Sequence, residues 1–157
     1  MGKNILLAVD AQQYAPEATE MALGLWHGPE DRIILLHVHE FAVGRFGRLQ
    51  VDCPEDVAER LITNIKTTMT DAGVNVSAEI GETHVGHIAR AIIEAAEKHD
   101  AAIIVLGSAR TTDLPHIPFG SVTHKVLHLA TRPVMIVPRQ AKRAHQPEHA
   151  AAAAMAG

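Results

Sequence analysis

The sequence predicts an α/β fold: a single, doubly wound domain in which helices cover both faces of a five-stranded parallel sheet. Three observations lead to this prediction. Short apolar runs of strand length alternate along the chain with segments of helical periodicity. The apolar runs are almost continuous, as is typical of strands that are buried on both faces. The 157 residues, 47% of them hydrophobic and 20% charged, suffice for one well-packed domain.

The first elements alternate as this fold requires. Residues 4–10 form the first expected strand, an apolar run that ends in the carboxylate of Asp10. A helix follows from Pro16, because proline suits a first helical turn, and Gly28 ends it. The apolar stripe of this helix recurs at helical spacing through Ala18, Met21, Ala22 and Leu25. Residues 32–38 form the second buried strand.

Residues 40–52 are long for a connection between a strand and a helix. The segment is therefore expected to be either a binding loop or a mobile one. Arg45 and Arg48 lie in it and could reach a phosphate, whereas in a solvated loop they would need no such role.

The second half of the chain repeats the alternation. Pro54 suits the first turn of the second helix, which Gly73 ends. Residues 75–80 alternate apolar and polar side chains, which is typical of a less buried strand at an edge of the sheet. The remaining elements are expected in the order helix, strand, helix, strand, over residues 88–99, 102–106, 122–130 and 133–137. The domain is expected to cover residues 1–139, and residues 140–157 to form a disordered tail.

Parallel strands bring their carboxyl ends to one edge of a sheet, where ligands of such folds bind. Asp10, Val38 and Gly107 all lie at predicted strand ends on that edge. A polar, proline-bearing stretch then leads from Gly107 to Gly120 and Ser121 at the start of a helix. Unpaired N–H groups at a helix N-terminus favour an anion, most often phosphate. Ser121 has a second interpretation, as the N-cap of that helix.

The composition excludes several classes of protein. The formal net charge of −4 and the pI of about 6.2 lack the basic excess of a general nucleic-acid binder. Cys53 is the only cysteine, so no intrachain disulfide is expected, and beside Pro54 it is expected to be a bland thiol rather than a nucleophile. No run approaches the roughly 20 apolar residues of a membrane span. We expect a soluble cytoplasmic protein without a signal peptide, a membrane span or a nucleic-acid partner.

Two histidine pairs have spacings that occur in metal sites. His37 and His39 alternate onto one face of the second strand, but the sequence places no Asp, Glu or Cys ligand beside them. His124 and His128 are four residues apart on a predicted helix, without the glutamate of a zinc-binding HExxH motif. Core or rim histidines and a polar helix face are the favoured interpretations, and no metal site is expected.

His84 and His87 spell HxGH, a signature of nucleotidylyltransferases, in which the histidines stabilise a transferring phosphate. In those enzymes the motif follows the first strand, whereas here it follows the third expected strand and opens a helix. A position near the helix cap is favoured for His87, and a nucleotidyltransferase is kept as a minor alternative.

The chain resembles the universal stress protein family over residues 3–139. The ATP-binding branch of that family carries G-x-x-G, nine residues, and then G followed by S or T. Gly107, Gly120 and Ser121 match this pattern with its spacing intact, and Arg110 replaces the second glycine. Further support comes from Asp10 after the first strand, the LLHV strand that ends at Val38, and the segments VGHIARAIIEAA and RPVMIVP.

The resemblance implies a Rossmann-like domain of the adenine nucleotide alpha hydrolase-like type, with ATP (or ADP or AMP) as its ligand. Mg²⁺ would be held through the phosphates only. The implied contact residues are Ala8, Val9, Asp10, Val38, Leu106, Gly107, Arg110, Gly120, Ser121 and Val122. In this assignment Asp10 contacts the ribose or adenine region, the Val38 backbone the adenine, and the start of the last helix the phosphates. No catalytic residue is assigned, so the expected role is that of a stress-response sensor or regulator with weak ATP hydrolysis at most.

Arg110 leaves two alternatives for the phosphate end. Its guanidinium either donates charge-assisted hydrogen bonds to the phosphates or occludes the channel, because arginine resists the positive φ open to glycine. In the second case the chain is a nucleotide-free interaction protein of the same fold. The resemblance also implies a homodimer that pairs the last strand, through Val134, Met135, Ile136 and Val137, across a two-fold axis.

Overall fold

Strands and helices alternate along the chain as expected. The structure is a computed structural model that describes residues 1–108 and 119–139. Its elements are β1 (Asn4–Ala8), α1 (Pro16–Leu25), β2 (Arg32–Gly44), β3 (Gly47–Gln50), α2 (Glu55–Asp71), β4 (Val76–His84), α3 (Ile88–Lys98), β5 (Ala101–Ser108), α4 (Ser121–Leu129) and β6 (Val134–Pro138). Arg110 and the expected tail, residues 140–157, lie outside the described residues.

The parallel strands are ordered β4-β2-β1-β5-β6. The chain moves from β1 to β2 and β4 on one side, and then to β5 and β6 on the other. The order therefore reverses between β1 and β5, and the carboxyl ends of these two strands border the position at which such sheets bind ligands. Within residues 1–108 and 119–139, β4 pairs with β2 alone, so the edge position expected for residues 75–80 is confirmed.

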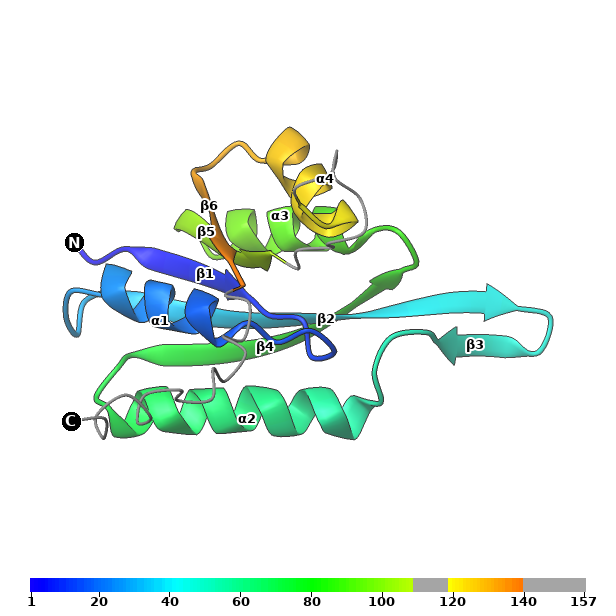
Figure 1. Ribbon diagram of the computed structural model, residues 1–157, viewed down its shortest axis with the longest axis horizontal. Helices are drawn as coiled ribbons and strands as arrows, with labels where there is room; N and C mark the ends of the chain where they lie inside the picture. The colour runs from blue at the N-terminus through cyan, green and yellow to red at the C-terminus, as the bar shows by residue number, and fades with distance from the viewer. Residues whose placement is uncertain (109–118, 140–157) are drawn as a thin grey trace, which may run out of the picture.

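The expectation of a loop over residues 40–52 is wrong. β2 continues to Gly44 and pairs with β3 in an antiparallel hairpin, which adds a strand to the five expected. Gly44 pairs with Gly47, whose φ is +115°, so that Arg45 and Phe46 alone make the turn. Figure 1 shows this hairpin extending past the rest of the sheet.

Arg48 is held within the hairpin region. Its Nη2 lies 2.7 Å from Oε2 of Glu82, and its guanidinium carbon lies 3.8 Å from the centroid of the Phe41 ring. The Arg48 side chain, which could reach a phosphate if the segment were a binding loop, is thus paired with Glu82 and Phe41 instead. Arg48 does not line the pocket described below.

Helices cover both faces of the sheet, with α1 and α2 on one face and α3 and α4 on the other (Figure 1). Side chains along each strand alternate between the two layers. Ile33 and Leu35 pack with α1 and α2, whereas Ile34 and Leu36 pack with α3 and α4. All four are buried, which explains why the strand is apolar throughout. The predicted doubly wound fold is therefore confirmed.

Met21 departs from the apolar stripe expected for α1. It is 42% exposed, while Ala18 and Ala22 are buried. The reason is its position near the last strand of the sheet, where it borders a shallow hollow with Val137 and Pro138. None of the helices in the described part of the chain combines the length and the hydropathy needed to cross a bilayer.

Candidate functional site

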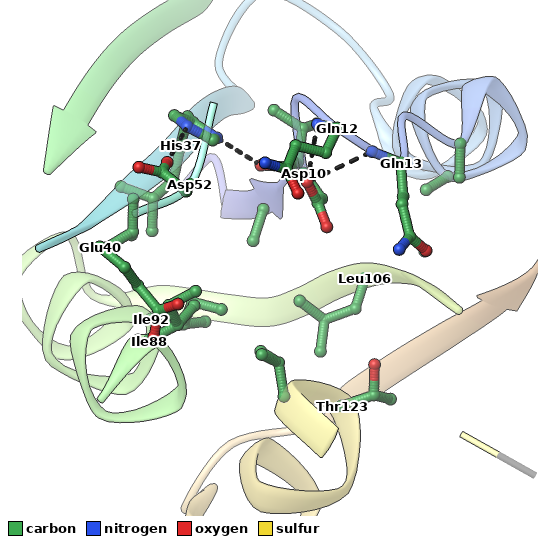
Figure 2. Close-up of a pocket in the computed structure, with 18 residues that line it drawn as sticks. Asp10, Gln12, Gln13, His37, Glu40, Asp52, Ile88, Ile92, Leu106 and Thr123 are labelled. Carbon is green, nitrogen blue, oxygen red and sulfur yellow. Dashed lines mark hydrogen bonds and ion pairs between the residues drawn. The ribbon is translucent and has the colours of Figure 1, made fainter. Parts of the chain in front are cut away.

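A pocket of about 270 Å³ opens where β1 and β5 end, beside Leu36, Val38 and Glu40 of β2 and at the position where the strand order reverses. This volume lies near the lower end of the roughly 300–1,000 Å³ of small-molecule sites. Figure 2 shows Asp10, Gln12 and Gln13 on one side of the cavity and Leu106 and Thr123 across from them.

Most of the predicted contact residues lie at this pocket. Those that line it are Ala8, Val9, Asp10, Val38, Leu106, Gly107 and Val122. Gly120 and Ser121 lie directly before Val122 at the start of α4 and are not among the lining residues. Arg110 lies outside the described residues.

Asp10 follows β1 and fulfils the turn-capping role that a carboxylate after a strand often takes. Its Oδ1 accepts the backbone N–H groups of Gln12, at 2.8 Å, and of Gln13, at 3.3 Å. Within residues 1–108 and 119–139, Oδ2 of Asp10 has no hydrogen-bond partner. The carboxylate is exposed, so this second oxygen is available to accept a hydroxyl donor from a ligand.

The backbone of Val38 faces the gap between β1 and β3. The carbonyl of Leu36 accepts the N–H of Val9, and the carbonyl of Glu40 accepts the N–H of Val51. Alternate residues of a strand direct their backbone groups to the same edge, so Val38 presents its N–H and C=O there as well. A paired donor and acceptor of this kind can recognise the edge of a heteroaromatic base.

Apolar side chains from both helices of one layer cover the rest of the pocket wall. Ile88 and Ile92 come from α3, Val122 comes from α4, and Leu106 comes from β5. Ile92 and Leu106 belong to the buried core between these helices and the sheet. A flat, weakly polar group would be desolvated favourably against this wall.

No side chain of residues 1–108 or 119–139 caps the start of α4. Gly120 is the N-cap residue, with φ −60° and ψ 162°. Ser121 is thus the first helical residue, and its interpretation as the N-cap is wrong. A Cβ on Gly120 would meet no heavy atom within 4 Å. The described residues therefore leave the first N–H groups of α4 open to an anion.

Gly107 has a packing role that the sequence did not indicate. A Cβ at this position would lie 2.6 Å from the Cβ of Ala15, just before α1. The glycine is thus required by the close approach of α1 to β5, independently of any ligand.

His37, His39, Asp52 and Cys53 form a buried cluster at the side of the pocket. Nδ1 of His37 lies 3.0 Å from the carbonyl oxygen of Val9, and Nδ1 of His39 lies 2.7 Å from Oδ2 of Asp52. The sequence placed the two histidines on one face but gave no signal for Asp52 and Cys53, which the β3 hairpin returns to them. His37 and Asp52 also line the pocket.

The ionisable groups of this cluster influence one another. Burial alone would raise the pKa of Asp52, but the hydrogen bond and the charge of His39 outweigh it and lower that pKa. Burial, followed by the charge of Asp52, raises the pKa of the Cys53 thiol. Cys53 is therefore a neutral thiol at physiological pH, as expected for a cysteine that is not a nucleophile.

The HxGH motif does not face the pocket. The His84 ring packs against Phe41, with centroids 4.4 Å apart, and His87 is the N-cap of α3. Neither histidine lines the cavity. Here the motif begins at the last residue of β4, an edge strand. In nucleotidylyltransferases it follows the first strand, so the two positions in the sheet differ.

Comparisons with known proteins agree with this architecture. Residues 1–138 match the model of the Universal stress protein family. Universal stress protein YxiE of Bacillus subtilis is 28% identical over 147 residues, which span 87% of this chain and 99% of YxiE.

Solved structures have the same fold. Protein MJ0577 of Methanocaldococcus jannaschii superposes with a TM-score of 0.67 and 25% identity, over 90% of this chain and 99% of MJ0577. A universal stress protein family protein from Arabidopsis thaliana, solved with AMP bound, has a TM-score of 0.62 and 20% identity, over 90% of this chain and 94% of that one.

Proposed function

Because this chain belongs to the universal stress protein family, we propose that it binds an adenine nucleotide in the pocket at the carboxyl edge of its sheet. One observation carries the proposal: three kinds of group meet at this pocket. They are Oδ2 of Asp10, the backbone edge at Val38, which is unpaired in the described residues, and the apolar wall that contains Ile92 and Leu106. The Arabidopsis thaliana relative with AMP bound supports an adenine nucleotide as the ligand.

Each part of the nucleotide has a matching group in this proposal. Oδ2 of Asp10 accepts a ribose hydroxyl, and the Val38 backbone pairs with the adenine edge. The wall that contains Ile92 and Leu106 desolvates the base. The N–H groups at the start of α4, beyond Gly120, donate to the phosphates. ATP, ADP and AMP all meet these requirements, and Mg²⁺ would be held through the phosphates alone.

We further propose that the chain acts in the cytoplasm as a sensor or regulator. In this role the ligand stabilises one state of the domain, and hydrolysis is weak at most. Binding stabilises the folded domain by a free energy that rises with the ligand concentration, and a change in nucleotide level changes the population of the liganded state.

A nucleotide-free interaction protein is the second candidate, because the hairpin carries exposed apolar side chains. Phe46 at its tip is fully exposed, and Val43 and Leu49 beside it are about two-thirds exposed, at 68% and 66%. Exposed apolar groups of this kind mark contact surfaces. A homodimer through β6 is also proposed: in the described part of the chain β6 pairs along one edge only, with β5.

Analysis of the ligand that accompanies the purified protein tests the first proposal. We expect mass spectrometry of the denatured full chain to detect an adenine nucleotide, at lower occupancy in Asp10→Ala. Recovery of a different class of ligand from the wild type, in equal amounts from Asp10→Ala, would contradict the assignment of the pocket. A protein that carries no ligand and forms dimers would favour the interaction protein.

A further inference from the structure

We propose that His37, His39, Asp52 and Cys53 bind one zinc-like divalent cation beside the pocket. The four side chains each offer a ligand atom, and these atoms lie within 4.8 Å of one another. The proposal goes beyond nucleotide binding and does not depend on it.

The spacing of the ligand atoms approaches that of a tetrahedral site. Metal–ligand bonds of about 2.0–2.3 Å give edges of about 3.3–3.8 Å in a tetrahedron of nitrogen, oxygen and sulfur atoms. Nε2 of His37 lies 3.6 Å from Oδ2 of Asp52 and 3.8 Å from Sγ of Cys53. Oδ2 of Asp52 lies 3.9 Å from Sγ of Cys53. These three edges need only small adjustments to hold a cation.

The other three edges all run to His39, and one of them is a hydrogen bond at present. Nδ1 of His39 lies 2.7 Å from Oδ2 of Asp52. A cation that replaces the shared proton would lengthen this contact by about half an ångström. Such a movement is small for a side chain of β2 and a side chain of the short segment between β3 and α2.

Hydrogen bonds do not provide a partner for every polar atom of the cluster. Nδ1 of His39 also lies 3.0 Å from Nε2 of Gln50, and one ring nitrogen cannot donate to Asp52 and accept from Gln50 at once. Oδ1 of Asp52 is buried without a hydrogen-bond partner in the described residues. A buried acceptor left unpaired is costly, and a cation bound to Oδ2 would place a positive charge beside this second oxygen.

His37 is already oriented as a metal ligand. Its Nδ1 donates to the carbonyl of Val9, so the lone pair of Nε2 faces Asp52 and Cys53. Metal-binding histidines generally donate their second nitrogen to such an acceptor, which fixes the tautomer. Both histidines and Cys53 are only 4% exposed, so the site is largely closed to water.

The donor set indicates the class of cation. Two imidazoles, a carboxylate and a thiolate suit Zn²⁺, whereas Mg²⁺ and Ca²⁺ prefer oxygen ligands throughout. Binding would release the thiol proton of Cys53 to solvent. The ion would join β2 to the segment that precedes α2, and would thereby fix the base of the hairpin.

Co²⁺ is a suitable probe, because a thiolate bound to it gives a charge-transfer absorption band. Cys53 is the only cysteine of the chain, so such a band can arise only from this residue. We expect the reduced, full-length protein to bind one Co²⁺ per chain with this band, and Zn²⁺ to abolish it. Binding without a thiolate band, or no binding, would overturn the proposal.

Substitutions distinguish cation binding at this cluster from binding at other histidines. Cys53→Ser should lose the band, and Asp52→Asn should weaken Co²⁺ binding at least 10- to 100-fold, about the loss seen when an outer-shell partner is removed. The control is His124→Ala combined with His128→Ala, an exposed pair on α4 with Nε2 atoms 3.3 Å apart, which should leave the band unchanged. Unchanged affinity in both Cys53→Ser and Asp52→Asn would contradict the assignment, and nucleotide affinity plays no part in this outcome.

Discussion

Gly107 lies so close to Ala15 that a Cβ on the glycine would approach the Cβ of Ala15 to 2.6 Å. This separation is well below an ordinary van der Waals contact. The glycine that begins the motif Gly107 to Gly120 therefore lets α1 pack against β5 at the wall of the pocket. A substitution there acts on the fold first, and any effect on a ligand follows from it.

Gly107→Ala should destabilise the domain by about 1–3 kcal/mol, because the added methyl group overpacks this contact. Urea unfolding followed by circular dichroism measures the change. Ala15→Gly in the same chain should recover part of the loss. The matched control is Gly81→Ala in β4, where the nearest side-chain atom is Cγ2 of Val38 at 3.8 Å. Equal losses in Gly107→Ala and Gly81→Ala would contradict this account.

Asp10 has two separable roles, and two substitutions distinguish them. Asp10→Asn keeps an oxygen that can accept the N–H groups of Gln12 and Gln13, but it loses the charge offered to a ligand. We expect near-normal stability and about 10- to 100-fold weaker AMP binding in this variant. Asp10→Ala should lower both the affinity and the thermal midpoint. If Asp10→Asn binds AMP as the wild type does, the carboxylate has no part in binding.

Gly120→Val should weaken the binding of AMP about tenfold while leaving the binding of adenosine unchanged. The φ of Gly120 is −60°, so valine causes no backbone strain, and its side chain would cover the N–H groups at the start of α4. Equilibrium dialysis with both ligands provides the comparison. Gly24→Val is the control, since a Cβ there also meets no atom within 4 Å. Equal loss of AMP and adenosine would argue against a phosphate at this helix.

The contacts of Glu79 with Lys98 and His99 should make the stability of the domain depend on pH. Its Oε1 lies 2.8 Å from Nζ of Lys98 and its Oε2 lies 2.7 Å from Nε2 of His99. These hydrogen bonds, that of Lys98 first, lower the pKa of Glu79 below its ordinary value of 4.5. The stabilisation is therefore fully present above pH 4.5 and is lost as the pH falls through the lowered pKa.

Glu79→Gln should accordingly lower the free energy of unfolding by about 0.5–1 kcal/mol at pH 7, because the pair is partly exposed to solvent. Urea unfolding at a series of pH values should show the difference from the wild type shrinking below pH 4.5. Glu59→Gln on the exposed side of α2 is the control and should show little difference at any pH. If the difference in unfolding free energy between the wild type and Glu79→Gln grew as the pH fell, the predicted pH dependence would be contradicted.

The parallel sheet could be predicted because its central strands are buried on both faces. Ile33 to Leu36 alternate between two helical layers, so every position is apolar and the strand is evident from sequence. The ends of β1 and β5 follow from the length of their apolar runs, so Asp10 and Gly107 lie at the carboxyl edge as expected. Val38 was expected at a strand end but lies inside β2, because this strand continues to Gly44. The proposal of an adenine nucleotide came from the resemblance, because the residue pattern alone indicates only an anion.

The hairpin could not be predicted, because its residues are exposed and its glycines lie outside the turn. Gly44 and Gly47 flank Arg45 and Phe46, whereas the common signal of a two-residue hairpin places glycine within the turn. Without the hairpin, nothing in the sequence brings Asp52 beside His39. The histidine pair was therefore considered alone, and the cluster became visible only in three dimensions. The role of Arg110 stays a prediction.

Equilibrium dialysis of the full-length protein against AMP, ADP and ATP tests the central claim most directly. We predict saturable binding of at least one of the three, with one nucleotide per chain and a weaker affinity in Asp10→Asn. The absence of saturable binding for all three nucleotides to folded wild-type protein would contradict the claim that this pocket is an adenine-nucleotide site.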